Sequence, residues 1–293
     1  MLVAAGQPVN DDVRQSQGWR RVLRSSPGRM AALPALAAVA FFTAPALYTN
    51  AAGLSGDVLE RRLKSAYPDH ISAVEGNAVI FKDGTRLPLD DGGGQKDFDA
   101  WLARPDIADM FRFDYPAGTA LTVPAQNFDP GRARNTAFFD KIYGNCRSGE
   151  VRQHLVSVVW LKTKAPQRVL ISARNGAAEK LRAVSTELDA LPETFDRFLF
   201  PIAGSYVCRA IAGTSSPSAH GYGIAIDIAL SHSNYWRWDQ RRDPLKRVPA
   251  YRNAIPIEIV AIFEKHGFIW GGRWSHYDTM HFEYRPELID PQR

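Results

Sequence analysis

Two short stretches near the C-terminus alternate between apolar residues and polar or small ones. Residues 224–229 interleave three isoleucines with Asp227 and two alanines, and residues 280–284 place apolar side chains on either side of His281 and Glu283. A period of two residues is typical of a half-buried β-strand. We therefore expect two strands of one sheet, with Asp227 on the face opposite the isoleucines and with His281 and Glu283 on one face.

Other segments have helical periodicity. Leucine and valine recur along one face of a helix predicted over residues 177–191. Residues 251–267 predict another helix, with a proline suited to its first turn and a glycine that stops it. Residues 151–161 and 168–173 are strand-like and are separated by a turn. Helices grouped before and between antiparallel strands indicate an α+β fold, in which an antiparallel sheet is flanked by helices.

The N-terminal part has a weaker pattern. Residues 54–72 predict a short amphipathic helix, and residues 77–89 predict a β-hairpin closed by an Asp-Gly turn. Another short helix is expected over residues 98–102, and the aromatic-rich stretch after it has no clear period. We interpret residues 52–130 as a small N-terminal subdomain and residues 131–293 as the main domain.

The first fifty residues resemble a targeting segment. Three arginines between residues 20 and 24 precede an uncharged run from Met30 to Tyr48. The centre of this run has the length of a signal-peptide apolar region, and the whole run approaches the length that spans a bilayer. We interpret residues 1–51 as a signal peptide or an N-terminal membrane anchor through residues 30–48; a buried core helix is the competing interpretation. The arginines place the rest of the chain outside the cytoplasm, in the periplasm or otherwise extracytoplasmic, with anchoring to the inner membrane as an alternative.

Charge does not indicate a nucleic-acid partner. The chain has 293 residues and a formal charge of +5. Residues 1–51 carry five arginines and two aspartates, so they hold +3 of this charge and the remainder holds only +2. No basic cluster elsewhere is interleaved with aromatic residues in the manner of a nucleic-acid surface. We exclude nucleic acid as a partner and expect a monomer.

The alternating stretches also contain candidate metal ligands. His220 and Asp227 lie in Ser-Ala-His-Gly-Tyr-Gly-Ile-Ala-Ile-Asp, and Asp278 and His281 lie in Asp-Thr-Met-His-Phe-Glu. Histidine and aspartate suit Zn²⁺, and a catalytic zinc keeps three protein ligands and one open position. His220, Asp227 and His281 supply three ligands, and Asp278 is left as a general base for the attacking water. A degenerate or structural cluster is the alternative.

These two motifs resemble the zinc D-alanyl-D-alanine carboxypeptidase family, which also includes phage L-alanyl-D-glutamate endolysins. Members cut the peptide stems of bacterial peptidoglycan. The resemblance spans about residues 205–288 and implies Zn²⁺ on His220, Asp227 and His281. It further implies Asp278 as the base, where many members have glutamate, and Arg209 as a contact to the substrate near the scissile carbonyl. The block that ends at Arg209 is also similar to the C-terminal domain of bacterial extensin-like proteins.

The function that this resemblance implies is an exported zinc metallopeptidase acting on peptidoglycan stem peptides. Ser218 and Glu283 are expected to orient the ligands or to touch the substrate. His276 either lines the site or lies in a surface loop, and residues 52–130 either serve as scaffold or cover the substrate groove. A non-catalytic wall-binding module that keeps the fold is the alternative function. The sequence leaves open whether the enzyme is a carboxypeptidase or an endopeptidase.

Cys146 and Cys208 are the two cysteines of the chain. In a chain that leaves the cytoplasm they are expected to form a disulfide. Closing a loop of this size stabilises a fold by about 4 kcal/mol in the chain-entropy model. Neither cysteine has the neighbours of a catalytic nucleophile, and a zinc ligand set is complete without them. The bond would also fix the backbone that presents Arg209.

Overall fold

In the computed structural model, the residues described are 56–211, 216–242 and 248–289. The predicted signal or anchor over residues 1–51, including the apolar run 30–48, lies outside these ranges. Within these ranges, none of the helices combines the length and the apolar character needed to cross a bilayer.

The two strands predicted to carry Asp227 and His281 belong to a three-stranded antiparallel sheet. Its order is β6 (Ala225–Asp227), β8 (His281–Tyr284) and β7 (Phe268–Trp270). In this register Asp227 lies directly opposite His281. Paired residues of neighbouring strands share a face of the sheet, so the two side chains lie together. The expected strand pair is confirmed, and β7 is a third strand that the sequence pattern did not reveal.

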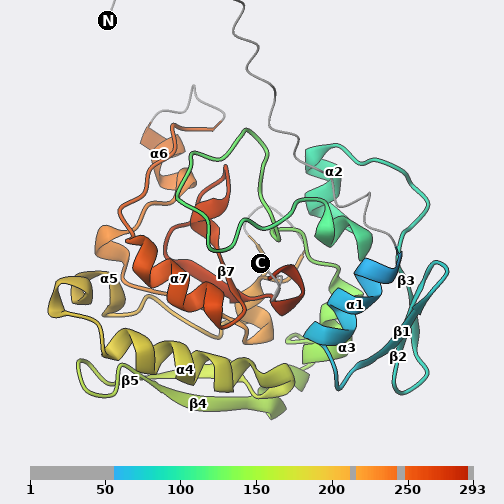
Figure 1. The fold of residues 1–293 in the computed structure, drawn as a ribbon, viewed down its shortest axis with the longest axis horizontal. Helices are drawn as coiled ribbons and strands as arrows, with labels where there is room; N and C mark the ends of the chain where they lie inside the picture. Colours follow the sequence, from blue (N-terminus) through green and yellow to red (C-terminus); the bar gives the residue numbers. More distant parts are fainter. Residues whose placement is uncertain (1–55, 212–215, 243–247, 290–293) are drawn as a thin grey trace, which may run out of the picture. The chain divides into compact units, whose positions relative to one another are not determined.

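Helix α7 (Ile257–Lys265) covers the other face of this sheet (Figure 1). The ring of Phe263 on α7 stacks on that of Phe282 on β8, with centroids 3.8 Å apart. Because Phe282 alternates with His281, one face of β8 belongs to the core and the other faces the candidate site. The helix starts later than predicted, since Pro256 lies at its N-cap with an extended backbone.

A second layer consists of the antiparallel hairpin β4 (Leu155–Trp160) and β5 (Gln167–Ser172), against which α4 (Ala177–Asp189) packs (Figure 1). Both predicted strands and the predicted helix are confirmed. The first strand starts four residues later than expected, because residues Glu150–His154 form a 3-10 turn. Two short helices follow in the chain, α5 (Asp196–Leu199) and α6 (Trp236–Arg242).

The N-terminal part contributes a three-stranded sheet of order β1-β2-β3 and two helices. These elements are α1 (Gly56–Ala66), β1 (Ile71–Glu75), β2 (Ala78–Phe81), β3 (Arg86–Pro88) and α2 (Phe98–Ala103). The predicted hairpin is confirmed as β2 and β3. The helix predicted over 54–72 is too long, because Pro68 follows its last turn and the chain then enters β1.

One hydrophobic core runs across the predicted boundary near residue 130. Tyr67, which follows α1, packs edge-on against Phe138 of α3 (Thr136–Tyr143), with ring centroids 5.2 Å apart. The Tyr67 hydroxyl also donates a hydrogen bond to Glu287 near the end of the chain. The division into residues 52–130 and 131–293 stays a prediction, but the two parts share their apolar interior.

Residues 112–135, here called the connecting segment, lead from the N-terminal elements to α3 (green in Figure 1). Glu264 of α7 is buried and accepts hydrogen bonds from the Tyr115 hydroxyl and the Gly118 backbone of this segment. Glu264 also pairs with the buried Arg273. The connecting segment is therefore held against the part of the fold that carries the second motif.

The expected disulfide between Cys146 and Cys208 is present, with the two Cα atoms 5.6 Å apart. It joins the turn after α3 to the strand-like stretch that precedes the first motif. Arg209 follows directly, and its carbonyl accepts a hydrogen bond from the backbone of Ser218. The crosslink thus holds the backbone that presents Arg209 beside the first motif.

Candidate metal centre

The local backbone brings the first two candidate ligands together. His220 lies in a 3-10 turn, Ala219–Tyr222, and Asp227 is the last residue of β6. Gly223 joins them with a φ of +68°, a conformation that favours glycine. A Cβ atom at Gly223 would also meet Leu155 at 2.6 Å. The backbone conformation therefore favours glycine between the two ligands, and the neighbouring Leu155 and Ser172 leave little room for a side chain.

The three predicted ligands form a compact triangle of donor atoms. Asp227 Oδ1 lies 3.2 Å from His220 Nε2 and 3.0 Å from His281 Nδ1, and the two nitrogens are 3.2 Å apart. Donor atoms about 2.0–2.1 Å from a tetrahedral zinc lie about 3.3 Å from one another. The separations and the donor types, two imidazoles and one carboxylate, therefore fit Zn²⁺.

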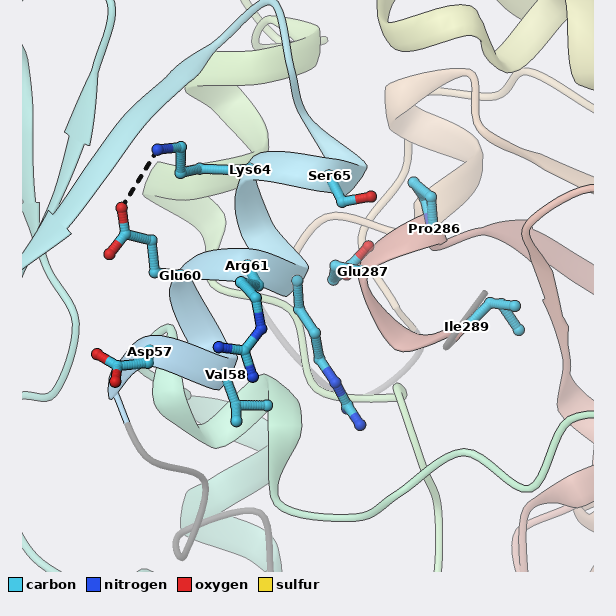
Figure 2. A pocket seen from close by; sticks show the side chains of 10 residues that line it. Asp57, Val58, Glu60, Arg61, Lys64, Ser65, Pro286, Glu287 and Ile289 are labelled. Atoms are coloured by element: carbon cyan, nitrogen blue, oxygen red, sulfur yellow. Dashed lines mark hydrogen bonds and ion pairs between the residues drawn. The ribbon is translucent and has the colours of Figure 1, made fainter. Parts of the chain in front are cut away.

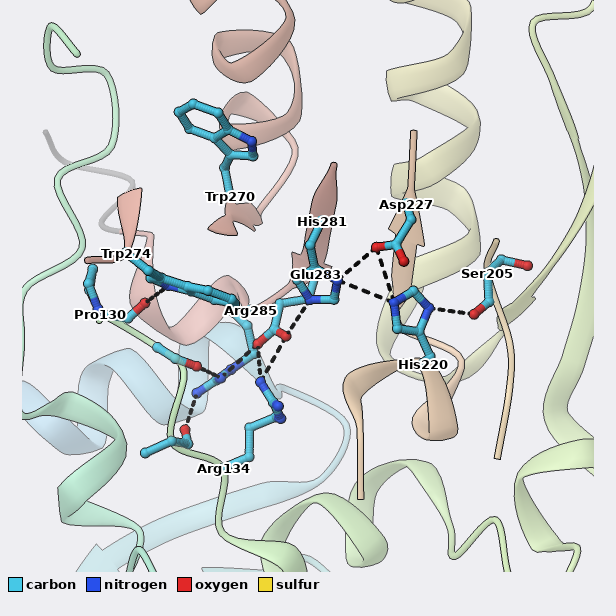
Figure 3. Close-up of polar contacts among 12 residues, drawn as sticks. Pro130, Arg134, Ser205, His220, Asp227, Trp270, Trp274, His281, Glu283 and Arg285 are labelled. Atoms are coloured by element: carbon cyan, nitrogen blue, oxygen red, sulfur yellow. Dashed lines mark hydrogen bonds and ion pairs between the residues drawn. The ribbon is translucent and has the colours of Figure 1, made fainter. Parts of the chain in front are cut away.

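Hydrogen bonds fix which nitrogen of each imidazole is available, as Figure 3 shows. His220 Nδ1 donates to the backbone carbonyl of Ser205, so that Nε2 carries the lone pair toward the triangle. His281 Nε2 contacts a carboxylate oxygen of Glu283 at 3.0 Å, so that Nδ1 is the free nitrogen. Such partners orient metal-binding histidines and select their tautomer.

Glu283 is fully buried and lies between His281 and two arginines (Figure 3). It accepts hydrogen bonds from Arg134 at 2.8 Å and from Arg285 at 3.1 Å. Burial opposes ionisation, but these guanidinium groups and His281 hold the pKa of Glu283 well below its usual range. Of the two roles expected for Glu283, this geometry favours orienting His281.

The charges inside the triangle are strongly coupled. Burial would raise the pKa of Asp227, yet the neighbouring His220 and His281 hold it well below its usual range. Burial would lower the pKa of His281, yet Asp227 and Glu283 raise it to about 10. An anionic carboxylate beside two imidazoles is a donor set to which a divalent cation would bind by displacing the proton of His281.

Asp278 lies beside this triangle. Its Oδ1 is buried and has no hydrogen-bond partner among the described residues. Burial and the charge of Asp227 together raise the pKa of Asp278 to about 6. A carboxylate with a raised pKa and an unoccupied oxygen can accept and return a proton near neutral pH.

The donor triangle and Asp278 share a small cavity of about 90 Å³. Ser218, which is buried, and Arg209, which is exposed, also line it, so the structure brings together all the predicted site residues of the two motifs except the buried Glu283. The cavity has further lining residues that the sequence motifs did not indicate: Arg132, Arg134, Ile211, Tyr235 and Trp274. His276 lines it as well, which decides between the two placements expected for that residue.

Arg132 and Arg134 come from a part of the connecting segment without a regular period, so only their spacing could have suggested that they share a face. Arg134 is held by Glu283, and the Arg132 guanidinium lies over the ring of Trp274 at 5.8 Å. Other histidines lie elsewhere in the fold. His266 follows the last turn of α7 and contacts Glu187 at 2.7 Å.

A larger hollow of about 670 Å³ lies beside α1 and the turn Pro286–Leu288 (Figure 2). Its described lining contains no histidine or cysteine. Its charged groups are partly satisfied: Lys64 pairs with Glu60, and Glu287 accepts hydrogen bonds from Tyr67 and Arg285. Volume alone therefore does not identify the site, and the smaller cavity holds the reactive groups.

One other group of carboxylates in the described ranges lies close enough to hold a cation: Asp90, Asp91 and Asp106. The ammonium group of Lys96 already contacts two of them, Asp91 and Asp106, at 2.8 Å each. This cluster is a local ion-pair network, and its donor set lacks the histidines that favour zinc.

Comparison with known proteins agrees with this geometry. Residues 212–284, a quarter of the chain, match the model of a protein family described as D-alanyl-D-alanine carboxypeptidase. The matched residues include all three donors and Asp278. The resemblance to zinc D-alanyl-D-alanine carboxypeptidases is confirmed over this segment, whereas the similarity to extensin-like proteins stays a prediction. Searches of curated proteins and of solved structures gave no match.

Proposed function

We propose that this protein is a zinc-dependent peptidase that hydrolyses peptide bonds in peptidoglycan stem peptides. The observation that carries the proposal is the donor triangle of His220, Asp227 and His281 beside Asp278, whose Oδ1 has no hydrogen-bond partner among the described residues. Three ligands with an adjacent base are the composition of a catalytic zinc site, whereas a structural zinc site has four protein ligands. The family match supports the class of substrate.

Zinc, when bound, supplies Lewis-acid chemistry that activates water and polarises a carbonyl group. Asp278 takes a proton from the attacking water through its unoccupied Oδ1 and passes it to the amine that departs. Arg209, exposed at the cavity, donates hydrogen bonds to the carbonyl oxygen on which negative charge develops. Glu283 keeps His281 in the orientation and tautomer that leave Nδ1 free.

A non-catalytic wall-binding module is the second candidate. Such a module would need the fold, but it would not need a buried carboxylate oxygen without a hydrogen bond, which lowers stability unless it serves another purpose. The unpaired Oδ1 of Asp278 therefore favours the enzyme. Wall binding that stays undiminished in protein without zinc, together with no hydrolysis, would instead support the module.

We also propose that the protein acts outside the cytoplasm. The disulfide between Cys146 and Cys208 supports this location, because such bonds persist in oxidising compartments. Peptidoglycan lies in the same space. Inner-membrane anchoring through residues 30–48 remains a separate proposal about a segment outside the described ranges.

The test combines metal analysis with product analysis on the same samples. We expect about one zinc per chain in the wild type and much less in His281→Ala, which removes one of three ligands. Purified muropeptides incubated with each protein and weighed by mass spectrometry should show stem cleavage only with the wild type. The mass lost would also distinguish a carboxypeptidase from an endopeptidase. Equal zinc in both proteins, or no cleavage by zinc-loaded wild type, would refute the proposal.

A further inference from the structure

Asp129, in the connecting segment, is a buried carboxylate that the proposed mechanism does not use. Its side chain has no exposed surface, and it lies outside the residues that match the peptidase family. One oxygen, Oδ1, accepts hydrogen bonds from the Ser275 hydroxyl at 2.8 Å and from the His276 backbone at 3.1 Å. The other, Oδ2, contacts His276 Nδ1 at 2.9 Å and Arg132 Nη1 at 2.5 Å. Both oxygens thus form hydrogen bonds with residues that line the cavity or lie next to its lining.

Arg132 supplies the counter-charge that allows Asp129 to be buried in ionised form. Burial raises the pKa of Asp129, but the Arg132 guanidinium and the hydrogen bond from His276 hold it well below its usual range. An ionised carboxylate can only accept hydrogen bonds, so the proton between Asp129 and His276 resides on Nδ1 of the imidazole. With the proton on Nδ1, the other ring nitrogen, Nε2, of the neutral imidazole carries a lone pair and can accept a hydrogen bond.

The ring of His276 also packs against two aromatic side chains. It stacks on Phe98 with centroids 5.1 Å apart and meets Trp236 edge-on at 4.8 Å. Its Nε2 has no hydrogen-bond partner among the described residues and is not one of the buried unpaired atoms. The ring lines the cavity of about 90 Å³ that also holds Asp278 and the donor triangle. Typical ligand pockets are several times larger, so a substrate group in this cavity lies close to His276.

We propose that Asp129 is a positioning residue of the active site, which holds the Nδ1–H of His276 and thereby presents Nε2 of this histidine to the substrate. The proposal rests on the proposed function for the identity of the substrate, a peptide amide. It also gives the connecting segment a part in the site, since residues before the matched segment would complete it. Residues 52–130 were expected either to serve as scaffold or to cover the substrate groove, and a positioning role for Asp129 favours the second.

The first test measures the tautomer of His276 directly and does not depend on activity. In Asp129→Asn a single carbonyl oxygen remains, and the Ser275 hydroxyl and the His276 backbone already use that position. The amide nitrogen then faces Nδ1 as a donor, so we expect the proton to move to Nε2. Long-range ¹H–¹⁵N correlation spectra of the zinc-loaded full chain, with the His276 signals assigned from His276→Gln, would show the change. An unchanged Nδ1–H tautomer in Asp129→Asn would overturn the proposal.

The second test is kinetic. Asp129→Asn should keep its zinc and lower kcat about 10–100-fold, the usual effect of removing a partner that orients a functional group. Because Asp129 acts through His276, the double variant with His276→Gln should be no slower than His276→Gln alone. Additive losses in the double variant would contradict the proposal.

Glu264→Gln is the matched control. Glu264 is also a buried carboxylate that fastens the connecting segment, but it lies away from the cavity. We expect its kcat to fall far less than that of Asp129→Asn, because its partners Tyr115, Gly118 and Arg273 do not line the cavity. A loss as large as that of Asp129→Asn would mean that loosening the segment is sufficient, and would overturn the positioning role. If the zinc-loaded wild type cleaves no stem peptide, the proposed function fails, and the tautomer measurement still decides the role of Asp129.

Discussion

At the residue scale, Asp278 has the environment that most directly suggests chemistry. It combines a buried carboxylate oxygen, which has no hydrogen-bond partner in the described part of the chain, with a pKa raised to about 6. Asp227 is fixed by two imidazoles, whereas no side chain in the described ranges forms a hydrogen bond or ion pair with Asp278. The two aspartates of the site are therefore assigned different roles by their surroundings, one as a ligand and one as a base.

Replacing Asp278 by asparagine tests this assignment. Asp278→Asn should retain the fold and nearly all the zinc, because the three ligands remain and the side-chain volume is unchanged. The rate of stem-peptide hydrolysis should fall by about two to four powers of ten, the usual contribution of a positioned base. Hydrolysis and zinc content would be measured on the same samples. Full activity would refute the base, and loss of zinc would make Asp278 a ligand.

Asp278→Glu is the companion variant at this position. It restores the residue found in many members of the family that the sequence resembles, and it lengthens the side chain by one methylene group. The cavity is only about 90 Å³, so the longer chain has little free space. Activity between that of the wild type and that of Asp278→Asn would indicate that reach, and not the carboxylate alone, sets the rate.

At the element scale, the turn between His220 and β6 decides whether the ligands meet. Gly223 adopts a φ of +68°, and a Cβ atom there would meet Leu155 at 2.6 Å and the backbone of Ser172 at 3.2 Å. The hairpin β4–β5 thus closes against the turn, and Ser172 donates a backbone hydrogen bond to Gly223. The geometry of the metal site depends on an element that contributes no ligand to it.

Gly223→Ala should therefore weaken both the fold and the metal site. The left-handed backbone alone costs about 1–2 kcal/mol for a residue with a Cβ atom, and overpacking against the hairpin typically adds about 1–3 kcal/mol. Gly84→Ala is the matched control, since it has a φ of +83° but open space around it. Urea unfolding should show the larger loss for Gly223→Ala, with weaker zinc binding in that variant only. Equal losses in the two variants would exclude a contribution from the hairpin contact.

At the scale of the whole molecule, buried carboxylates join the N-terminal part to the two motifs. Asp129 and Glu283 are both fully buried and both have pKa values held well below the usual range by arginine partners. In the unfolded chain they titrate near pH 4. The folded protein therefore binds fewer protons than the unfolded chain when the pH falls below about 5.

This linkage predicts acid sensitivity. The stabilisation from Asp129 and Glu283 is present above their unfolded pKa values and is lost as the pH falls toward their folded values. Asp278 acts in the opposite direction, because its raised pKa favours folding at low pH, but Asp227 also has a lowered pKa, so one carboxylate opposes three. The free energy of unfolding of metal-free protein, measured in urea, should fall between pH 5 and pH 3. A constant value over this range would contradict the assignment of both carboxylates as ionised.

The disulfide gives a second prediction at this scale. Protein from an oxidising compartment, denatured without reductant, should have no free thiol, because both cysteines are in the bond. Reduction should lower the free energy of unfolding by about 2–4 kcal/mol, the usual effect of losing such a crosslink. Titration of two reactive thiols before reduction would remove the disulfide and the support that it gives to export.

The sequence by itself determined the local features of this protein. Alternation in residues 224–229 and 280–284 predicted both strands of the site, because burying one face of a strand imposes a period of two. The spacing of His220, Asp227, Asp278 and His281 identified the candidate ligands and base, since their chemistry requires those residue types. Helix α4 and the hairpin β2–β3 followed equally from periodicity and turn residues. Boundaries were less accurate where a proline, such as Pro68 or Pro256, ended or delayed a helix.

Only the tertiary structure decided which distant residues complete the site. Asp129 and Arg132 come from a stretch without a period, and nothing local indicates that a carboxylate about 150 residues before His276 holds its ring. The placement of His276 was undecided for the same reason, because an imidazole in a loop has no periodic environment to reveal its burial. Such contacts depend on the path of the connecting segment across the fold, which is fixed by long-range burial and ion pairing, and not by the pattern of neighbouring residues.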